Sequence, residues 1–176
     1  PVDKDSWGVL KTTAVQPLQY QEIQNKTLPN NLEPRPGNEV FDGDILFTRA
    51  GPMNRVGILC VARPTRPKLM LSDKIIRVHL IPGLDPDFAA LSMTAGYSSD
   101  FIEVLKSGMA ASQVNISQPK LRSVPIPIPP LAEQRRIVAK VDQLMALVDE
   151  LETQLAASRA TAKNLLQALV AELTAG

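Results

Sequence analysis

The most regular pattern of apolar residues lies in the last quarter of the chain. Apolar or small side chains recur there in alternating steps of four and three residues. This spacing averages 3.5 residues, which is the seam of a left-handed coiled coil. The pattern predicts one helix over 131–173, about 60 Å long. The seam positions are Ile137, Val141, Leu144, Val148, Leu151, Leu155, Ser158, Ala162, Leu165 and Leu169.

A proline-rich segment predicts where this helix begins. The prolines within residues 124–130 fix φ and remove backbone donors, so that segment must be extended. No proline follows Pro130, and proline is favoured in the first turn of a helix. We therefore expect a globular domain over 1–128 and a long helix over 129–176. So long an apolar stripe requires a partner, either a second chain or, as the alternative, its own domain.

Shorter patterns ahead of the prolines predict a mixed domain. Strands are expected after the Asp-Gly-Asp turn within 40–49, at 55–62 and at 74–81. Helices are expected over 84–105, in two pieces broken around Gly96, and over 118–123 with Ser117 as its cap. Residues 107–115 are expected to form a loop of small residues. The predicted fold class is α+β: a small globular domain with a twisted, mostly antiparallel sheet and short helices, followed by one long coiled-coil helix.

Composition agrees with a folded protein that works in the cytoplasm. The chain has 176 residues, of which 44% are hydrophobic and 21% charged. No signal peptide or membrane-spanning stretch is visible. The single Cys60 excludes an intrachain disulfide and is expected to be a small buried hydrophobe. Since Pro1 is not a start methionine, we expect a chain that is processed or cut from a longer one.

Charge is unevenly distributed along the sequence. Residues 45–84 carry seven lysines and arginines against Asp73 alone, and residues 106–122 carry three cations and no acid. These two stretches predict a surface that binds a polyanion, although a solvated basic surface without a partner would have the same composition.

The residue inventory argues against catalysis. One histidine, His79, and one cysteine make neither a nucleophile–base pair nor a zinc site. No glycine-rich phosphate loop is present. We expect His79 at the surface, and we expect no metal, no cofactor and no catalytic residue on this chain.

Two polar clusters remain as candidate DNA contacts. The first is the turn 47–55, where arginines flank a glycine; the second is the amide-rich segment 112–115 with the cations that follow it. Arginine, asparagine and glutamine can read base edges, while lysine and hydroxyl groups hold phosphates. Either cluster could instead be an ordinary surface turn. The candidate residues are Thr48, Arg49, Asn54, Arg55, Lys74, Ser112, Gln113, Asn115 and Lys120.

At these residues the chain resembles a known family. The segments 43–52, 113–116 and above all 126–138, which reads Ile-Pro-Ile-Pro-Pro-Leu-Ala-Glu-Gln-Arg-Arg-Ile-Val, are similar to the DNA-specificity subunit of type I restriction–modification systems. The resemblance covers nearly the whole chain.

The resemblance implies a non-catalytic subunit that reads one half of a bipartite DNA site. It implies double-stranded DNA, methyltransferase subunits and a restriction–translocase subunit as partners, with S-adenosylmethionine bound on the methyltransferase. Paired long helices would act as a ruler between two reading domains. This chain has one such unit, so it is either a natural half that pairs with a copy or sibling, or half of a longer protein. The helix interface would use Leu131, Gln134, Ile137, Val141, Leu144, Val148, Leu151, Leu155, Leu165 and Leu169.

Two other functions fit parts of the sequence. The chain could be a coiled-coil scaffold that binds no DNA, or the recognition fragment of a fused restriction–methylation enzyme. The salt dependence of duplex binding distinguishes a DNA reader from a scaffold, because affinity for DNA phosphates falls steeply as the salt concentration rises.

Overall fold

Strand β5 (Ile45–Thr48) lies at the centre of the core, and all four of its side chains are buried. It pairs in antiparallel fashion with β7 (Leu59–Val61) on one side and with β9 (Ile75–Val78) on the other. Because both faces of β5 are covered, its sequence does not alternate between apolar and polar residues. A strand is present in each of the three predicted regions, but β7 and β9 are shorter than the predicted 55–62 and 74–81.

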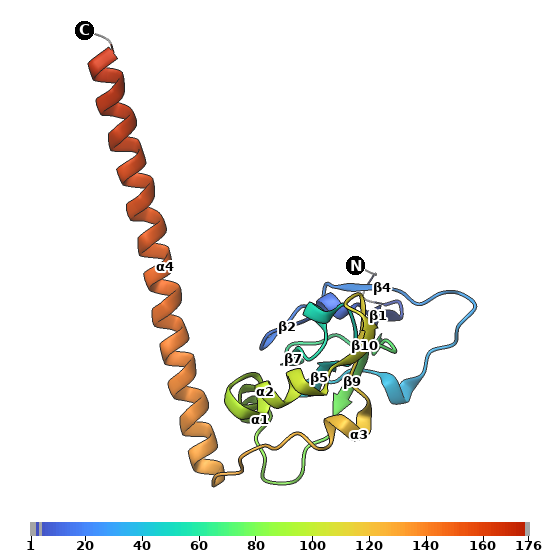
Figure 1. Ribbon diagram of the computed structural model, residues 1–176. Helices are drawn as coiled ribbons and strands as arrows, with labels where there is room; N and C mark the ends of the chain where they lie inside the picture. The colour runs from blue at the N-terminus through green and yellow to red at the C-terminus, as the bar shows by residue number, and fades with distance from the viewer. Residues whose placement is uncertain (1–2, 4, 175–176) are drawn as a thin grey trace. The chain divides into compact units, whose positions relative to one another are not determined.

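Two helices cover one face of this sheet (Figure 1). Helix α1 (Pro86–Thr94) is capped by Asp85, whose side chain accepts hydrogen bonds from the backbone N–H groups of residues 87 and 88. Helix α2 (Gly96–Leu105) follows after a break at Gly96, where φ is +57°. The predicted division of 84–105 into two pieces is confirmed. The core on this face contains Ile45, Phe47, Val56, Leu59, Ala89, Ala90, Met93, Ile102, Val114 and Ile116.

The other face of β5 packs against the N-terminal segments. Strand β1 (Gly8–Leu10) pairs antiparallel with β4 (Asn25–Thr27) and parallel with β8 (Leu69–Met70), and β2 (Val15–Gln16) forms a hairpin with β3 (Gln19–Tyr20). Cys60 is buried in this second core, as predicted. In the described residues the strands make four small sheets rather than one continuous sheet, and β1–β8 is the single parallel pair among them.

The segment predicted as a loop of small residues is instead a hairpin, so that prediction was wrong. Strand β10 (Ser107–Ala110) pairs with β11 (Gln113–Asn115), which also pairs with β6 (Ala50–Gly51). Small residues have weak strand propensity, so no strand is predicted here from the residue types alone. Helix α3 (Gln118–Leu121) follows, and the Ser117 side chain accepts from the backbone N–H of Lys120, confirming the predicted cap. Short 3-10 turns lie at Thr12–Ala14, Pro36–Asn38 and Met53–Arg55.

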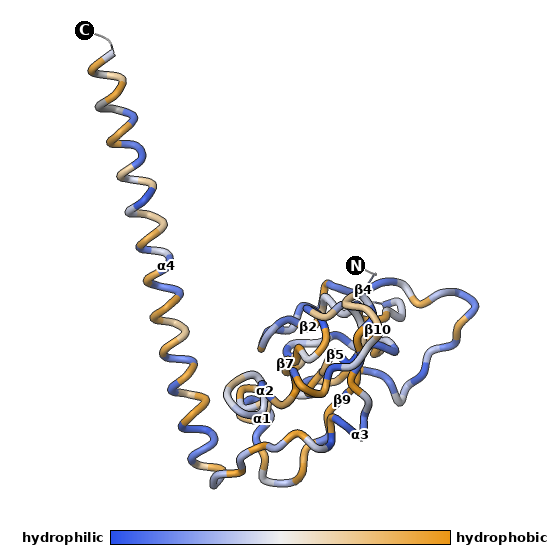
Figure 2. The backbone as a smooth tube through the Cα atoms, in the orientation of Figure 1, coloured by the Kyte–Doolittle hydropathy of each residue, from blue (hydrophilic) through white to orange (hydrophobic). Residues whose placement is uncertain are grey.

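The structure is a computed structural model that describes residue 3 and residues 5–174, apart from the side chains of residues 168, 169 and 172. Its contacts divide the chain into two units, Pro1–Arg135 and Arg136–Gly176. The first unit holds all the elements above together with the first turn of α4 (Leu131–Thr174). The predicted long helix is confirmed. Figure 2 shows hydrophobic positions recurring between hydrophilic ones along its length.

Candidate nucleic-acid interface

Four of the predicted contact residues meet where the hairpin β10–β11 leaves the core. The backbone N–H of Arg49 donates to Lys74 O at 2.9 Å, and Arg49 O accepts from the N–H of Ile116, next to Asn115, at 2.8 Å. The Lys120 ammonium donates to the Ser107 hydroxyl at 3.4 Å, and Ser107 pairs with Asn115. We call Arg49, Lys74, Asn115 and Lys120 the hairpin root. The root brings three cations and one amide to the same edge of the domain, where Asp73 is also exposed and its backbone O accepts from the Arg49 Nε at 2.8 Å.

Three further candidates lie at the other end of the hairpin. The backbone N–H of Met53 donates to Ala111 O at 2.7 Å, which holds the turn containing Asn54 against the hairpin turn 111–112. Asn54, Ser112 and Gln113 are all exposed there, and we call them the hairpin tip. Since a strand rises about 3.3 Å per residue, Ser112 and Asn115 are separated by about 10 Å. Root and tip are thus the two ends of one short ribbon.

The amides of β11 point away from the core. Gln113 and Asn115 are exposed, whereas Val114 between them is 3% exposed and belongs to the core. Alternate residues of a strand lie on the same face, so both amides lie on the outer one. Among the hydrogen bonds of the described residues, none involves either side-chain amide. Both groups are available to an external partner.

Thr48 and Arg55 require correction, because the structure gives both side chains internal roles. Thr48 is 0% exposed, and its hydroxyl donates to Ile58 O and accepts from the Ile58 N–H, both at 3.0 Å. The Arg55 guanidinium donates to Gln16 Oε1 and to two backbone oxygens of residues 12 and 15, at 2.6–3.1 Å. Both side chains hold the turn after β5 in place and are not available as DNA contacts.

Several other cations of the basic stretch are also used within the domain. Arg66 is 8% exposed and donates to backbone oxygens of residues 6 and 67. Arg77 forms an ion pair with Asp44 at 2.8 Å, and Arg63 pairs with Asp87 at 2.6 Å. Fewer cations of this stretch are therefore free to bind an external partner than its number of lysines and arginines indicates.

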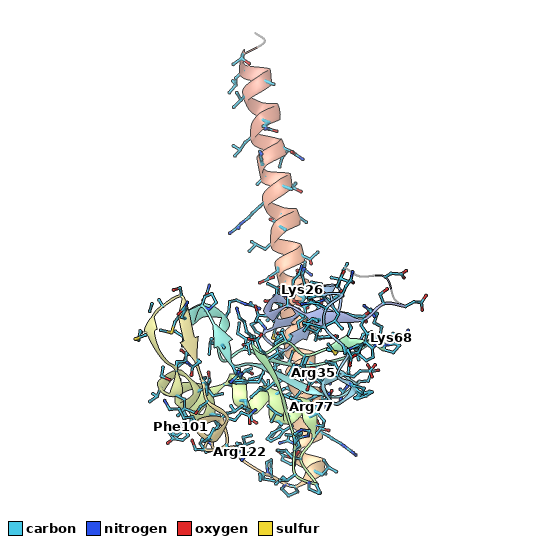
Figure 3. All side chains as sticks on the ribbon, turned by 90° about the vertical axis from the view of Figure 1, so that its right-hand side faces the viewer. Lys26, Arg35, Lys68, Arg77, Phe101 and Arg122 are labelled. Atoms are coloured by element: carbon cyan, nitrogen blue, oxygen red, sulfur yellow. The ribbon has the colours of Figure 1, made fainter. Side chains whose placement is uncertain are left out.

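A broad hollow beside β9 is a rival surface. Lys26, Arg35 and Arg122 line it, but so do Glu33 and Asp73, together with many apolar side chains. Figure 3 shows Arg122 below Lys26 and Arg35 and to their left. Its two acids and many apolar side chains make it a weaker site for a polyanion than the hairpin root, where one acid, Asp73, lies beside three cations.

Gln134, predicted at the helix interface, is corrected by the structure. Its side chain is 0% exposed and is bound within the first unit, so it cannot face a partner helix. Leu131 is 39% exposed, and Ile137 and Val141 are half-buried. The side chain of Leu169 lies outside the described residues. The remaining interface candidates are exposed on α4, namely Leu144, Val148, Leu151, Leu155 and Leu165.

The perturbed titratable groups lie away from the hairpin. Burial raises the pKa of the Cys60 thiol to about 12, and burial raises the pKa of Tyr20 to about 12 although its hydroxyl bonds to Thr65. His79 is exposed, as predicted. Across residue 3 and residues 5–174, no three His, Cys, Asp or Glu side chains gather in a way that could hold a metal ion. In that same part of the chain, no helix is long and apolar enough to span a bilayer.

Comparisons with known proteins agree on one family. Residues 16–158 match the family described as "Type I restriction modification DNA specificity domain". The chain is 51% identical over 168 residues to the Escherichia coli type I restriction enzyme EcoEI specificity subunit, covering 95% of this chain and 28% of that protein. It is 41% identical over 142 residues to the Escherichia coli EcoDI specificity subunit, covering 79% of this chain and 29% of that protein.

A more distant relative agrees on the family, and a solved structure shares the fold. The chain is 30% identical over 142 residues to the EcoKI specificity subunit of Escherichia coli strain K12, covering 79% of this chain and 30% of that protein. The chain thus spans less than a third of the length of these relatives. A chain in a solved structure on complex assembly and conformational transition of the type I R-M system has the same fold, with a TM-score of 0.70 at 20% identity. That match covers 95% of this chain and 43% of the other.

Proposed function

Since the chain belongs to the type I restriction–modification DNA specificity family, we propose that its first unit reads a short base sequence in double-stranded DNA. The observation that carries this proposal is the edge made by the hairpin root and tip. Arg49, Lys74 and Lys120 supply positive charge there, beside the outward amides of Gln113 and Asn115. Cations hold phosphates and amides read base edges, so the edge has both kinds of group that a sequence reader needs.

In this proposal the chain recognises DNA and places other subunits, but does no chemistry itself. Its relatives are named as specificity subunits of restriction enzymes. Methyl transfer would belong to methyltransferase subunits, which would also bind S-adenosylmethionine, and cleavage to a restriction–translocase subunit.

Helix α4 would join this chain to others through its apolar stripe. Leu144, Val148, Leu151 and Leu155 are each between 44% and 63% exposed and follow the 3.5-residue repeat. We propose that the stripe pairs with the same helix of a second copy or of a sibling half, and that methyltransferase subunits dock on the pair. A helix of about 60 Å would set an upper limit of roughly 18 base pairs between two half-sites.

A binding titration tests the reading function. The methylated sites of the host genome would be mapped with and without this gene, and a duplex carrying the site would be titrated with the chain, alone and with its methyltransferase subunits. We expect affinity to fall steeply with salt, with a log–log slope of about −0.9 per phosphate contacted. Absence of duplex binding in both preparations would instead favour the scaffold.

Substitution of Arg49 separates two kinds of contact. If Arg49 reads a base, Arg49→Ala should cost about 1–3 kcal/mol and relax specificity at one base pair. If it holds a phosphate, affinity should fall equally for all sequences and the salt slope should decrease by about one. Gln19→Ala, an exposed strand position outside root and tip, serves as the control.

A further inference from the structure

The hairpin β10–β11 is thin and almost entirely exposed. Every residue from Ser107 to Gln113 is exposed, and the sequence through β10 and the turn is Ser-Gly-Met-Ala-Ala-Ser. Met109 is 105% exposed, although an apolar side chain of that size is usually buried. The core contact of the ribbon is made by Val114, on the inner face of β11. Burial of the other ribbon residues therefore does not explain why this segment is extended.

A bulge held by Gly108 shapes the ribbon. Ser107 pairs with Asn115 and Ala110 with Gln113, so β10 has one more residue between the pairs than β11. A Cβ added at Gly108 would lie 2.2 Å from Gln113 O, which no side chain can occupy. The two strands approach so closely that only glycine fits there. This packing keeps the ribbon narrow and fixes the backbone of Gln113.

We propose that this ribbon enters the major groove of DNA and that Gln113 and Asn115 are the residues that read bases. The inference rests on the proposed function and assigns its specificity to two side chains. The major groove of B-DNA is about 12 Å wide and admits a two-stranded ribbon. Apart from Met109, the side chains of β10 are those of Ser107, Gly108 and Ala110, which are small enough to let the backbone approach the base edges.

The spacing of the two Cα positions is close to the rise of two base-pair steps. Gln113 and Asn115 are two residues apart on one face, which places their Cα atoms about 6.6 Å apart. Two base-pair steps amount to about 6.8 Å. Each amide can therefore face a different base pair, with one pair between them. A carboxamide pairs with adenine through N6 and N7, so each amide selects an A·T pair.

Charge on the chain favours DNA as the occupant. Between Glu103 and Asp142 the sequence has a single acid, Glu133, and none lies within residues 104–132. Glu103 itself is paired with Lys106 at 2.6 Å. Arg49, Lys74 and Lys120 stand at the root, where the phosphates beside an occupied groove would lie. The ribbon has no negative group of its own to repel them.

Single substitutions in the intact assembly test the assignment. The chain with its methyltransferase subunits would be titrated against the mapped site and against duplexes with every single base-pair change. We expect Gln113→Ala and Asn115→Ala each to lose roughly 5- to 150-fold of discrimination at one base pair. The two affected pairs should be two steps apart. Affinity for unrelated DNA and the salt slope should stay the same, and Gln19→Ala should change neither specificity nor affinity.

The results distinguish the two proposals. Suppose that the parent binds the site with a steep salt slope. If both ribbon variants then keep the parent's base preferences, or lose affinity equally for all sequences, the ribbon assignment is wrong and the proposed function stands. If the parent binds no duplex, the proposed function is wrong and the ribbon assignment with it. Unchanged fluorescence of Trp7, the single tryptophan, would show that the variants are folded.

Discussion

Gln134 connects the first turn of α4 to the loop ahead of α1, and removing its amide tests whether that connection stabilises the domain. Its Nε2 donates to Gly83 O at 3.0 Å and to Pro129 O at 2.8 Å. Its Oε1 accepts from the backbone N–H of Asp85 at 2.8 Å. The side chain is 0% exposed, so these bonds are made in place of bonds to water.

The expected cost of Gln134→Ala follows from those bonds. Three hydrogen bonds at a net contribution near 1 kcal/mol each would give about 3 kcal/mol. Gly83 is itself exposed, so water can reach its carbonyl once the amide is gone and offset part of the loss. We therefore expect the free energy of unfolding to fall by about 2–3 kcal/mol.

Urea unfolding followed by Trp7 fluorescence measures this change, because Trp7 lies in the first unit and α4 alone gives no such signal. The control is Gln143→Ala, an exposed glutamine of the same helix, which should change stability by less than about 0.5 kcal/mol. If Gln134→Ala and Gln143→Ala shift the midpoint equally, the buried amide does not stabilise the domain and the reasoning fails.

Gln134→Glu tests the same site through the direction in which stability changes with pH. The carboxylate has no proton to donate to the two carbonyls, and burial disfavours its charge, so its pKa should lie above that of an unfolded chain. A raised folded pKa contributes stability that is fully present below the unfolded pKa and is lost as pH rises through the folded one. Relative to the parent, Gln134→Glu should therefore be less stable at pH 8 than at pH 4.

Three further predictions concern other parts of the chain. Changing Leu144 and Leu151 together to Asp places charges in the proposed seam and should abolish self-association in sedimentation; a variant that stays dimeric would refute that interface. Gly108→Ala should remove site-specific DNA binding and lower the unfolding free energy by about 0.5–3 kcal/mol, because the added Cβ would lie 2.2 Å from Gln113 O and force the backbone of the bulge to shift; retained specificity would contradict the bulge geometry. Burial raises the pKa of Cys60 and the pKa of Tyr20 to about 12. The two neutral groups therefore contribute stability that is fully present below their unfolded pKa values near 9 and 10, and that is lost as pH rises towards 12. Cys60→Ala should make urea unfolding less sensitive to alkaline pH, and an unchanged slope would argue against the burial of that thiol.

Much of the fold could be predicted because it depends on local patterns. The four-residue run of β5, the heptad spacing of α4 and the break at Gly96 are each visible in a short window of sequence. The hairpin 107–115 could not be predicted in this way. Its strands are held by a pairing with β6, which lies more than fifty residues earlier, and by a glycine whose necessity appears only when Gln113 O is placed beside it.

The sequence predicts which residue types form the candidate site, but it does not identify which individual side chains are free to contact DNA. Arg49 and Arg55 flank the same turn and have the same chemistry, so the sequence does not tell them apart. In the structure the Arg55 guanidinium meets three acceptors of the N-terminal segment, while the Arg49 Nε meets only Asp73 O in the described hydrogen bonds. Gln134 was likewise assigned to a partner helix from its position in a helical motif. Only the position of the 83–85 loop shows that its amide is used internally.

The alternation along β11 explains how specificity can change while the fold is kept. Val114 and Ile116 are 3% and 0% exposed and fix the strand to the core, whereas Gln113 and Asn115 contact nothing that the core needs. Because successive side chains of a strand point to opposite faces, the anchoring and reading residues alternate without competing for space. A change of the amides to Arg or Ser should thus alter the base sequence read and leave stability within about 0.5 kcal/mol of the parent. The same change at Val114 would bury a polar group in the core, which is costly. A chain that acquires new specificity should therefore vary at positions 113 and 115 before it varies at 114 or 116.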